Sequence, residues 1–335
     1  MLSVNDKLSD TDAVGIGRKG TIDKPLYLKA PFWTVDTLFY CTSKENSDVK
    51  FIYLLFQIIN WKRYDESTGV PSLSKNTISN IKTYVPKIEE QDYISKLFFS
   101  LDNTLQLHER KCEELALIKQ ALLQKLFPKK DEVIPEVRYK SFSAAWEQRK
   151  LGDISKTKRG LTYKPSNIDN TGIRVLRSSN IKEDTFVISD NDVFVKESAV
   201  NIPFVKNGDI LITAANGSTN LVGKHAIIRD IPKNSAVHGG FMLITTSKEY
   251  EFLNASMSSN WYKKFIKKYV AGGNGAIGNL RKNDLDNQKI YVPKKDEQEK
   301  IGNFFKMLDS LITLHQRKLD HLELMKKGLL QQMFV

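Results

Sequence analysis

Residues 84–127 read YVPKIEEQDYISKLFFSLDNTLQLHERKCEELALIKQALLQKLF, and residues 291–334 read YVPKKDEQEKIGNFFKMLDSLITLHQRKLDHLELMKKGLLQQMF. The two stretches align without a gap at an offset of 207 residues (291 − 84), and roughly half of their positions are identical. This offset is far longer than the repeats of about 20–50 residues that build solenoids. The sequence therefore predicts a duplicated unit, in which a globular domain is followed by a long helix.

Each copy predicts a helix that begins just after a proline. Pro86 and Pro293 stand where a helix can begin but not continue, and acidic residues follow at once, which suits the positive end of the helix dipole. Apolar residues then recur at alternating intervals of four and three, which is typical of a coiled coil. At about 1.5 Å per residue, each helix would be roughly 57 Å long. Two matching helices in one chain most economically pack on each other.

The apolar pattern also predicts which residues form the contact between the two helices. In the first copy we expect Ile94, Leu101, His108, Leu115 and Leu122. In the second copy we expect Ile301, Leu308, His315, Leu322 and Leu329. Ile118, Met325 and Met333 continue the same pattern.

Composition sets the bounds of the function. The 335 residues allow two domains with connecting elements, and a net charge of +12 suggests a polyanionic partner, although ribosomal and membrane-surface proteins share this feature. Cys41 and Cys112 lie far apart and lack the spacing of metal ligands. The longest apolar run, residues 51–59, is about half of what a bilayer requires, and no signal peptide opens the chain. We therefore expect a reduced, cytoplasmic protein without a membrane partner.

Five segments follow from the pattern along the chain. Residues 1–83 form a first globular region, with strand-like stretches around Tyr27 and over residues 32–40 and a buried helix over residues 51–61. The other segments are a first long helix (84–127), a proline-containing linker (128–145), a second globular region (146–290) and a second long helix (291–335). The predicted fold is α+β, with two α/β domains and two long helices that pack on each other as a coiled coil.

The second region contains several short strand candidates bounded by Gly, Asn, Asp and Pro. They are residues 173–181, 185–189, 208–213, 224–229 and 240–246. A helix with Met257, Trp261 and Phe265 on one face and lysines on the other follows them.

The offset indicates that the first region is shorter than the second. Residue 1 corresponds to about residue 200–208 of the second unit, which begins near Trp146, so about 55–60 residues lack a counterpart. We therefore expect a half-domain, in which strand edges and apolar faces around Trp33 and Phe39 lack part of their cover.

Candidate catalytic signatures fail. GIGRKG (15–20) formally matches GxGxxG, but a dinucleotide site needs a helix directly afterwards, and IDKPLYL follows instead. The sequence has no GxxxxGKS or GxxxxGKT loop, no HExxH, no Cys/His metal set, and no Asn-Pro-Pro-aromatic or Asp-Pro-Pro-aromatic tetrapeptide of amino-methyltransferases. His108 and His315 recur as a pair, but on a helix contact a polar residue that sets the alignment is favoured over a catalytic histidine. These observations favour a binding role.

Several motifs together resemble the specificity subunit of type I restriction-modification systems. They are WEQRKLGDI (146–154), GDILI (208–212), the YVPK start of both repeats, the Leu-Asp pairs at 101–102 and 308–309, and both LLQxxF ends. The resemblance implies a non-catalytic subunit in which two target-recognition domains each read one half of a split DNA target. The sequence departs from the family at its amino terminus, where the family has a complete first recognition domain.

The resemblance also implies partners. The two long helices would form an antiparallel coiled coil, which would set the spacing between the half-sites and dock two methyltransferase subunits. Restriction/translocase subunits would join the complex through these partners. No cofactor is expected on this chain, because S-adenosylmethionine and ATP would be bound by the partner subunits.

Reading double-stranded DNA needs basic side chains for phosphates and forked or amide side chains for base edges. Predicted loops of the second region carry such residues: Lys158, Arg159, Thr162, Lys164, Arg174, Arg177, Ser178, Asn180, Asn216, Ser218, Thr219, Lys224, Asn279, Arg281 and Lys282. Arg18 and Lys19 hold the corresponding place in the first region. For any single residue, ordinary turn chemistry is an equal alternative, and only the set as a whole favours DNA.

Three functions remain open at this point. The favoured one is a sequence-specific DNA-binding subunit that contributes no chemistry. A second is a truncated, silent or homodimerising half-specificity subunit. A third is a self-contained DNA methyltransferase or nuclease, which methyl transfer by the isolated chain would reveal. The bases recognised do not follow from the sequence, because these loops have no residue-to-base code.

Overall fold

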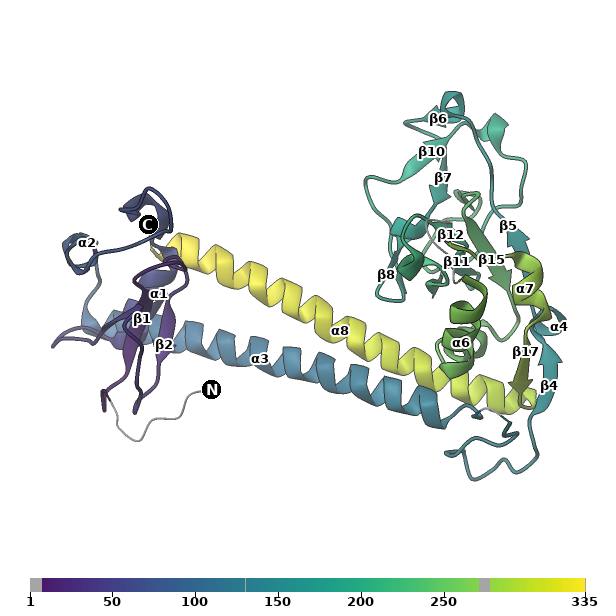
Figure 1. The fold of residues 1–335 in the computed structure, drawn as a ribbon, viewed down its shortest axis with the longest axis horizontal. Helices are drawn as coiled ribbons and strands as arrows, with labels where there is room; N and C mark the ends of the chain where they lie inside the picture. Colours follow the sequence, from purple (N-terminus) through teal and green to yellow (C-terminus); the bar gives the residue numbers. More distant parts are fainter. Residues whose placement is uncertain (1–7, 130, 271–277, 335) are drawn as a thin grey trace. The chain divides into compact units, whose positions relative to one another are not determined.

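A computed structural model describes residues 8–129, 131–270 and 278–334, and Figure 1 shows the order of its elements. The chain forms two compact units. The first unit contains Met1–Cys112 and Thr313–Val335, and the second contains Glu113–Ile312. Each long helix therefore contributes one part to each unit.

The two predicted long helices are α3 (Ile88–Lys125) and α8 (Lys295–Met333). In the first unit, the beginning of α3 packs on the end of α8, where Phe98 is fully buried against Leu329 and Leu330. Each helix begins two residues after the proline of its YVPK motif, as the helix-start signals predict. No described helix is long and apolar enough to cross a bilayer.

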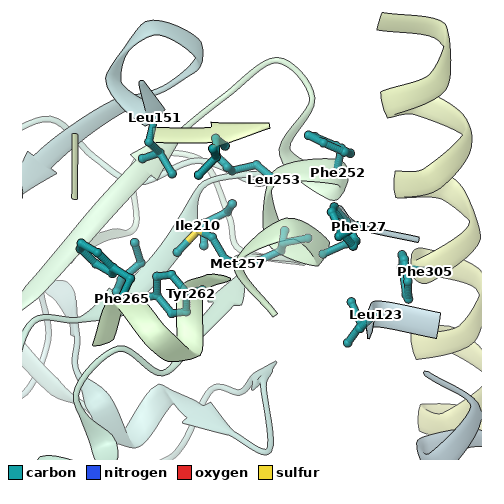
Figure 2. Packing of buried hydrophobic residues seen from close by; sticks show 14 of the residues in the cluster. Leu123, Phe127, Leu151, Ile210, Phe252, Leu253, Met257, Tyr262, Phe265 and Phe305 are labelled. Carbon is teal, nitrogen blue, oxygen red and sulfur yellow. The ribbon is translucent and has the colours of Figure 1, made fainter. Parts of the chain in front are cut away.

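In the second unit, the end of α3 packs on the beginning of α8. Phe127, just after α3, lies between Phe252 and Phe305, with ring centroids 5.8 and 6.2 Å away (Figure 2). Leu123 belongs to the same buried cluster. In both units the start of one helix therefore meets the end of the other, which is the antiparallel pairing that the family resemblance implies.

Ion pairs repeat the antiparallel order. In the first unit Lys326 donates to Asp102 at 2.5 Å, and in the second Lys119 contacts Asp309 at 2.6 Å. The two pairs are equivalent under the repeat, because 309 − 102 and 326 − 119 both give 207. An antiparallel pair of copies requires such an exchange, in which the acid of each copy meets the base of the other.

His108 and His315 meet inside the helix pair of the first unit, with their Nδ1 atoms 2.7 Å apart. One ring must donate the proton and the other must accept it, so two positive charges do not fit. Burial, together with the neighbouring His108 ring, lowers the pKa of His315. His315 therefore favours the neutral imidazole in the folded chain.

The described burial follows the predicted helix contact only in part. Ile94, Leu115, Ile301 and Leu308 are buried, whereas Leu101, His108, Leu122, His315, Leu322 and Leu329 are half-buried. Ile118, Met325 and Met333 are exposed instead, so extending the pattern to them was wrong. A straight helix has 3.6 residues per turn and drifts by about 20° per heptad from a strict repeat, so the contact moves to neighbouring positions such as Leu123.

The first globular region is a three-stranded antiparallel sheet with short helices. Its elements are β1 (Ala13–Gly17), β2 (Leu26–Leu28), β3 (Leu38–Cys41), α1 (Val49–Ile58), η1 (Trp61–Tyr64) and α2 (Lys75–Asn80), and the strand order is β2-β1-β3. Val14 and Ile16 of the central strand pack with Phe56 and Trp61. Asp48 caps α1 and also accepts the Ser95 hydroxyl at 2.6 Å, which ties α1 to α3.

The second globular region is built mainly from short strands. They are β4 (Glu147–Lys150), β5 (Lys156–Arg159), β6 (Ile168–Asp169), β7 (Ile173–Leu176), β8 (Ile181–Lys182), β9 (Thr185–Phe186), β10 (Val193–Val195), β11 (Ile210–Thr213), β12 (Ala215–Asn216), β13 (His225–Ile227), β14 (Ala236–His238), β15 (Met242–Thr246), β16 (Gly278–Asn279) and β17 (Lys289–Val292). Its helices are α4 (Leu151–Ile154), η2 (Pro165–Asn167), η3 (Ser178–Asn180), η4 (Glu197–Ala199), η5 (Thr219–Leu221), α5 (Tyr250–Met257), α6 (Asn260–Val270) and α7 (Lys282–Asn287).

Two four-stranded sheets organise this region, in the orders β14-β7-β10-β6 and β13-β11-β15-β5. The single helix expected around Trp261 is two helices, α5 and α6, because α5 ends at Ser258, whose N–H bonds back to the last turn. Ile210, Tyr262 and Phe265 belong to the cluster of Figure 2, on which the ends of the long helices also pack.

Both globular regions contain the same three-stranded arrangement. A central strand lies between two antiparallel neighbours in β2-β1-β3 and in β13-β11-β15. In the second region, β5 extends this sheet beyond β15, and β4 pairs with β17 just before α8. Among the described residues of the first region, β4, β5 and the sheet β14-β7-β10-β6 have no counterpart.

Candidate nucleic-acid interface

Several polar segments of the second region meet where its strands end. They follow β5, β7 and β11, form the turn between β14 and β15, and include β16. We call this surface the loop cluster and define it by Thr162, Arg177, Ser178, Asn216, Phe241 and Asn279. Arg177, Thr162 and Asn279 are exposed, and Ser178 and Asn216 are half-buried.

Backbone hydrogen bonds hold the segments of the loop cluster together. The N–H of Leu161 donates to the carbonyl of His238 at 2.7 Å, and the N–H of Gly239 donates to that of Leu176 at 2.9 Å. The N–H of Leu280 donates to the carbonyl of Ala214 at 2.7 Å. The segments after β5, β7 and β11 are therefore fixed relative to the turn after β14 and to β16.

A glycine allows the closest of these approaches. A Cβ atom at Gly160 would lie 1.9 Å from the carbonyl oxygen of Gly239, a distance that no side chain tolerates. Any other residue would push the Thr162 segment away from the turn between β14 and β15. The glycine therefore has a structural reason that also positions a predicted site residue.

Asn216 joins two segments of the loop cluster directly. Its Nδ2 atom donates to Ser178 Oγ at 3.1 Å, and its Oδ1 atom accepts the N–H of Ser218 at 2.9 Å. In β12 it pairs with Gly278 of β16, which brings Asn279 next to the same surface. Asn216 therefore combines a half-buried anchor with a place on the loop cluster.

The structure places the remaining predicted residues as follows. Lys158, Arg159, Lys164, Ser218, Thr219, Lys224 and Arg281 are exposed. Lys158 and Arg159 lie on β5, the edge strand of its sheet, and Arg281 caps the start of α7. In the first region, Arg18 and Lys19 are exposed just after β1, and the Arg18 guanidinium lies 5.7 Å from the Phe39 ring centroid.

Three predicted residues are occupied by internal interactions. Asn180 is fully buried and donates to Asp192 at 2.8 Å, while Arg174 pairs with the same carboxylate and lies over the Phe194 ring. Lys282 pairs with Asp286 at 2.6 Å within α7. We therefore do not expect Asn180, Arg174 and Lys282 to contact DNA.

The titration of His238 fits a structural role beside the loop cluster. Burial lowers the pKa of His238 to about 4, and its Nε2 atom lies 3.3 Å from the carbonyl of Lys158. A neutral ring that bonds the backbone joins β14 to β5. Among the described residues, no three His, Cys, Asp or Glu side chains converge as metal ligands would.

Phe241 belongs to the loop cluster, although sequence reasoning did not single it out. Its side chain is 73% exposed. The sequence prediction included it in a strand over residues 240–246, whereas β15 begins at Met242. Two glycines followed by an aromatic residue were the available signal, since they mark a turn in front of a strand.

The comparisons with known proteins agree with this architecture. Residues 2–117 and 144–324 match the model of the family described as type I restriction modification DNA specificity domain. The specificity subunit of the type I restriction enzyme MjaVIII of Methanocaldococcus jannaschii is 25% identical over 283 residues. The alignment covers 80% of this chain and 65% of that relative, so the chain spans just under two thirds of the relative's length.

Solved structures share the fold. The crystal structure of the S subunit of a type I restriction-modification system from M. genitalium gives a TM-score of 0.69 at 15% identity, covering 99% of this chain and 85% of that one. A second structure, which concerns complex assembly and conformational transition of a type I system, gives a TM-score of 0.53 at 14% identity and covers 98% and 83% of the two chains. The family match over most of the sequence, together with the repeated recognition region and helix, identifies this chain as a member of the type I restriction-modification DNA specificity family.

Proposed function

We propose that this chain is the sequence-reading subunit of a type I restriction-modification complex and performs no chemistry itself. The observation that carries the proposal is the loop cluster, where rigidly joined segments expose a guanidinium, amides and hydroxyls on one surface. Membership of a DNA specificity family supports it.

The side chains of the loop cluster match the chemistry of base edges. The exposed guanidinium of Arg177 has the forked donor geometry that suits guanine, and the exposed amide of Asn279 suits adenine. Lys224 and Lys158 are exposed point charges, which suit phosphates. The loop cluster would thus read bases while the lysines orient the chain on the duplex.

The long helices supply a docking surface for partners. Outward-facing leucines recur at equivalent positions of the two repeats: Leu107 and Leu117 on α3, and Leu314 and Leu324 on α8, each at least 49% exposed. Two copies of one apolar surface fit two copies of one partner. We infer that two methyltransferase subunits bind there, carry the S-adenosylmethionine, and link the chain in the cytoplasm to restriction/translocase subunits that use ATP.

The test uses the chain assembled with its methyltransferase subunits. Mapping the modified bases in cells defines the target, and binding is then measured with that duplex. Arg177→Ala should relax the specificity at one position by roughly 1–3 kcal/mol, whereas Lys224→Ala should weaken binding to all sequences and flatten its salt dependence. Unchanged DNA binding after both substitutions at moderate salt, or methyl transfer by the isolated chain, would contradict the proposal.

A second candidate is a half-specificity subunit, in which only the second region reads DNA without help. The observation that favours it is the exposure of Tyr84 and Val85, at 99% and 56%. The equivalent Val292 is only 3% exposed and lies in β17, which pairs with β4. Such a chain could dimerise, and its target would then be a palindrome made from one half-site. The modified-base map separates the two candidates, because a complete first region gives two unrelated halves.

A further inference from the structure

Phe241 is unusual because it exposes a large aromatic side chain on a polar surface. With 73% of its area in water, it is the most exposed of the large apolar residues that the structure describes in the second region, where Ile168, Ile188 and Tyr269 reach 49%, 46% and 42%. Aromatic residues dominate cores and interfaces because of the apolar area they bury. So large an exposed aromatic surface suggests that Phe241 contacts a binding partner.

The backbone holds Phe241 in this position. Its carbonyl accepts the N–H groups of Ala214 and Ala215 at 2.8 and 3.0 Å, and the N–H of Met242 closes the turn onto Gly239 at 2.8 Å. Met242 at the start of β15 is 1% exposed and Ala214 just after β11 is 6% exposed, so these neighbouring residues already fill the core. The Phe241 ring therefore has no place in the core and stays outside.

The backbone on both sides of Phe241 lies next to predicted base-reading residues. A Cβ atom at the preceding Gly240 would lie 3.2 Å from Thr162 Oγ1, and Ala215, which donates to Phe241, pairs with Asn279. On the other side of the same turn, Gly239 lies against the Arg177 side chain. The turn that carries the exposed Phe241 thus lies next to residues with hydroxyl, amide and guanidinium side chains.

We propose that Phe241 is a specificity-determining residue, which packs its ring against the base pairs of the bound duplex. The inference rests on the proposed function and adds an apolar contact to it. Apolar side chains recognise thymine methyl groups or enter base steps, where they read sequence and deformability. The ring carries no charge, so its contact should not change the number of neutralised phosphates.

A protein partner fits this surface less well. The residues next to the turn of Phe241, Thr162, Arg177 and Asn279, are polar, and protein interfaces need an apolar centre around an aromatic anchor rather than a single ring. A ring among forked and amide donors instead matches a partner that offers apolar and polar groups side by side. Base edges have this chemistry.

The experiment compares Phe241→Ala and Phe241→Leu with Ile188→Ala, an exposed apolar control, in the complex assembled with methyltransferase subunits. Fluorescence anisotropy measures the Kd for the cognate duplex and for a scrambled duplex at several salt concentrations. Phe241→Ala should weaken cognate binding about 5- to 100-fold, leave scrambled binding and the salt slope unchanged, and Phe241→Leu should fall between. Ile188→Ala should match the wild type.

Three outcomes would overturn the inference. They are an unchanged cognate Kd for Phe241→Ala, an equal loss on both duplexes, and failure of the variant to assemble with methyltransferase subunits while its fold is intact. Unchanged thermal unfolding, expected for so exposed a side chain, excludes misfolding as the cause. If the wild-type complex itself does not discriminate the two duplexes, the proposed function fails. If the wild-type complex does discriminate them and Phe241→Ala binds both duplexes as the wild type does, only this inference fails.

Discussion

The same four residues, Tyr-Val-Pro-Lys, precede both long helices but adopt different states. In the second unit, Tyr291 and Val292 belong to β17, which pairs with β4, and Val292 is 3% exposed. In the first unit, Tyr84 and Val85 form no strand and are 99% and 56% exposed. Identical sequence thus becomes a strand only where a neighbouring strand supplies hydrogen bonds and cover, because strand preference depends on context.

The sheets of the two regions differ in the same way. The outer edge of β15 pairs with β5 from Lys156 to Arg159. Its counterpart β3 has neighbours on one side only within the described part of the chain, and Tyr40 is 41% exposed there. The first region therefore has the inner strands of the second without the strands that cover them.

The largest expected difference in stability between the two units follows from substituting two equivalent glutamates, Glu297 and Glu90. Glu297 is 1% exposed and accepts two bonds from Arg138, at 2.7 Å each, whereas Glu90 in the first copy is exposed. Glu297→Ala should destabilise the second unit by about 3–5 kcal/mol, because it leaves the Arg138 guanidinium, whose side chain is only 12% exposed, without its carboxylate partner. Glu90→Ala should change stability by less than about 0.5 kcal/mol. Urea unfolding followed by unit-resolved hydrogen exchange measures both; equal losses would contradict the comparison.

The next largest difference in stability is expected from aspartate substitutions at the equivalent leucines Leu115 and Leu322. Leu115 is 9% exposed within the main cluster of the second unit, and Leu322 is half-buried in the first. Leu115→Asp should cost about 2–4 kcal/mol and Leu322→Asp about half as much, since each places a carboxylate at the helix contact. Both should weaken binding of methyltransferase subunits in a pull-down. Leu117→Asp, at a 67% exposed position, is the stability control, and an equal loss of stability there would exclude the paired helices as the cause.

Alanine substitutions at the equivalent valines Val292 and Val85 test whether the strand β17 has a counterpart in the first unit. Val292→Ala should destabilise the second unit by about 2 kcal/mol through lost burial, and Val85→Ala should cost less than about 0.5 kcal/mol. Thermal unfolding gives both values. A loss at Val85 as large as that at Val292 would mean that Val85 is covered in solution. Hydrogen exchange over residues 8–63, which we expect to be faster than over the second region, would then be slow as well.

The smallest expected difference between the two units is the stability that each loses at acidic pH. Burial lowers the pKa of His238 to about 4 and also lowers the pKa of His225, both in the second region. A histidine with a lowered folded pKa contributes stability above its unfolded pKa of about 6.5 and loses it as the pH falls through the folded value. At pH 5.5, the protonation of His238 alone should cost the second unit on the order of 1 kcal/mol relative to pH 8.

The pH prediction has a matched variant. His238→Gln keeps a neutral polar side chain and should reduce the acid loss of the second unit without affecting the first. The helix-pair histidine His315, whose pKa is also lowered, should give the first unit a loss of the same sign. Unit-resolved hydrogen exchange at pH 8 and pH 5.5 measures each effect. Higher stability of the second unit at pH 5.5 would contradict the burial of neutral histidines.

Local and periodic features could be predicted from the sequence. The long helices follow from a pattern sustained over many turns, and their starts follow from Pro86 and Pro293. The pairing of the helices follows from duplication, because two copies of one apolar face bury each other, whereas their antiparallel direction was implied by the family resemblance. Strand cores such as GDILI were also predicted, since β11 begins at Ile210, although strand ends shifted by several residues. The motifs of the second region identified the family.

Only the tertiary structure decided which polar residues are available to a partner. Arg177 and Asn180 lie three residues apart in one predicted loop, yet Asn180 is consumed by Asp192 while Arg177 remains exposed. Phe241 faces outward because Met242 fills the core beside it. Such outcomes depend on groups distant in the sequence, which compete for the same hydrogen bonds and space, and no local pattern records that competition.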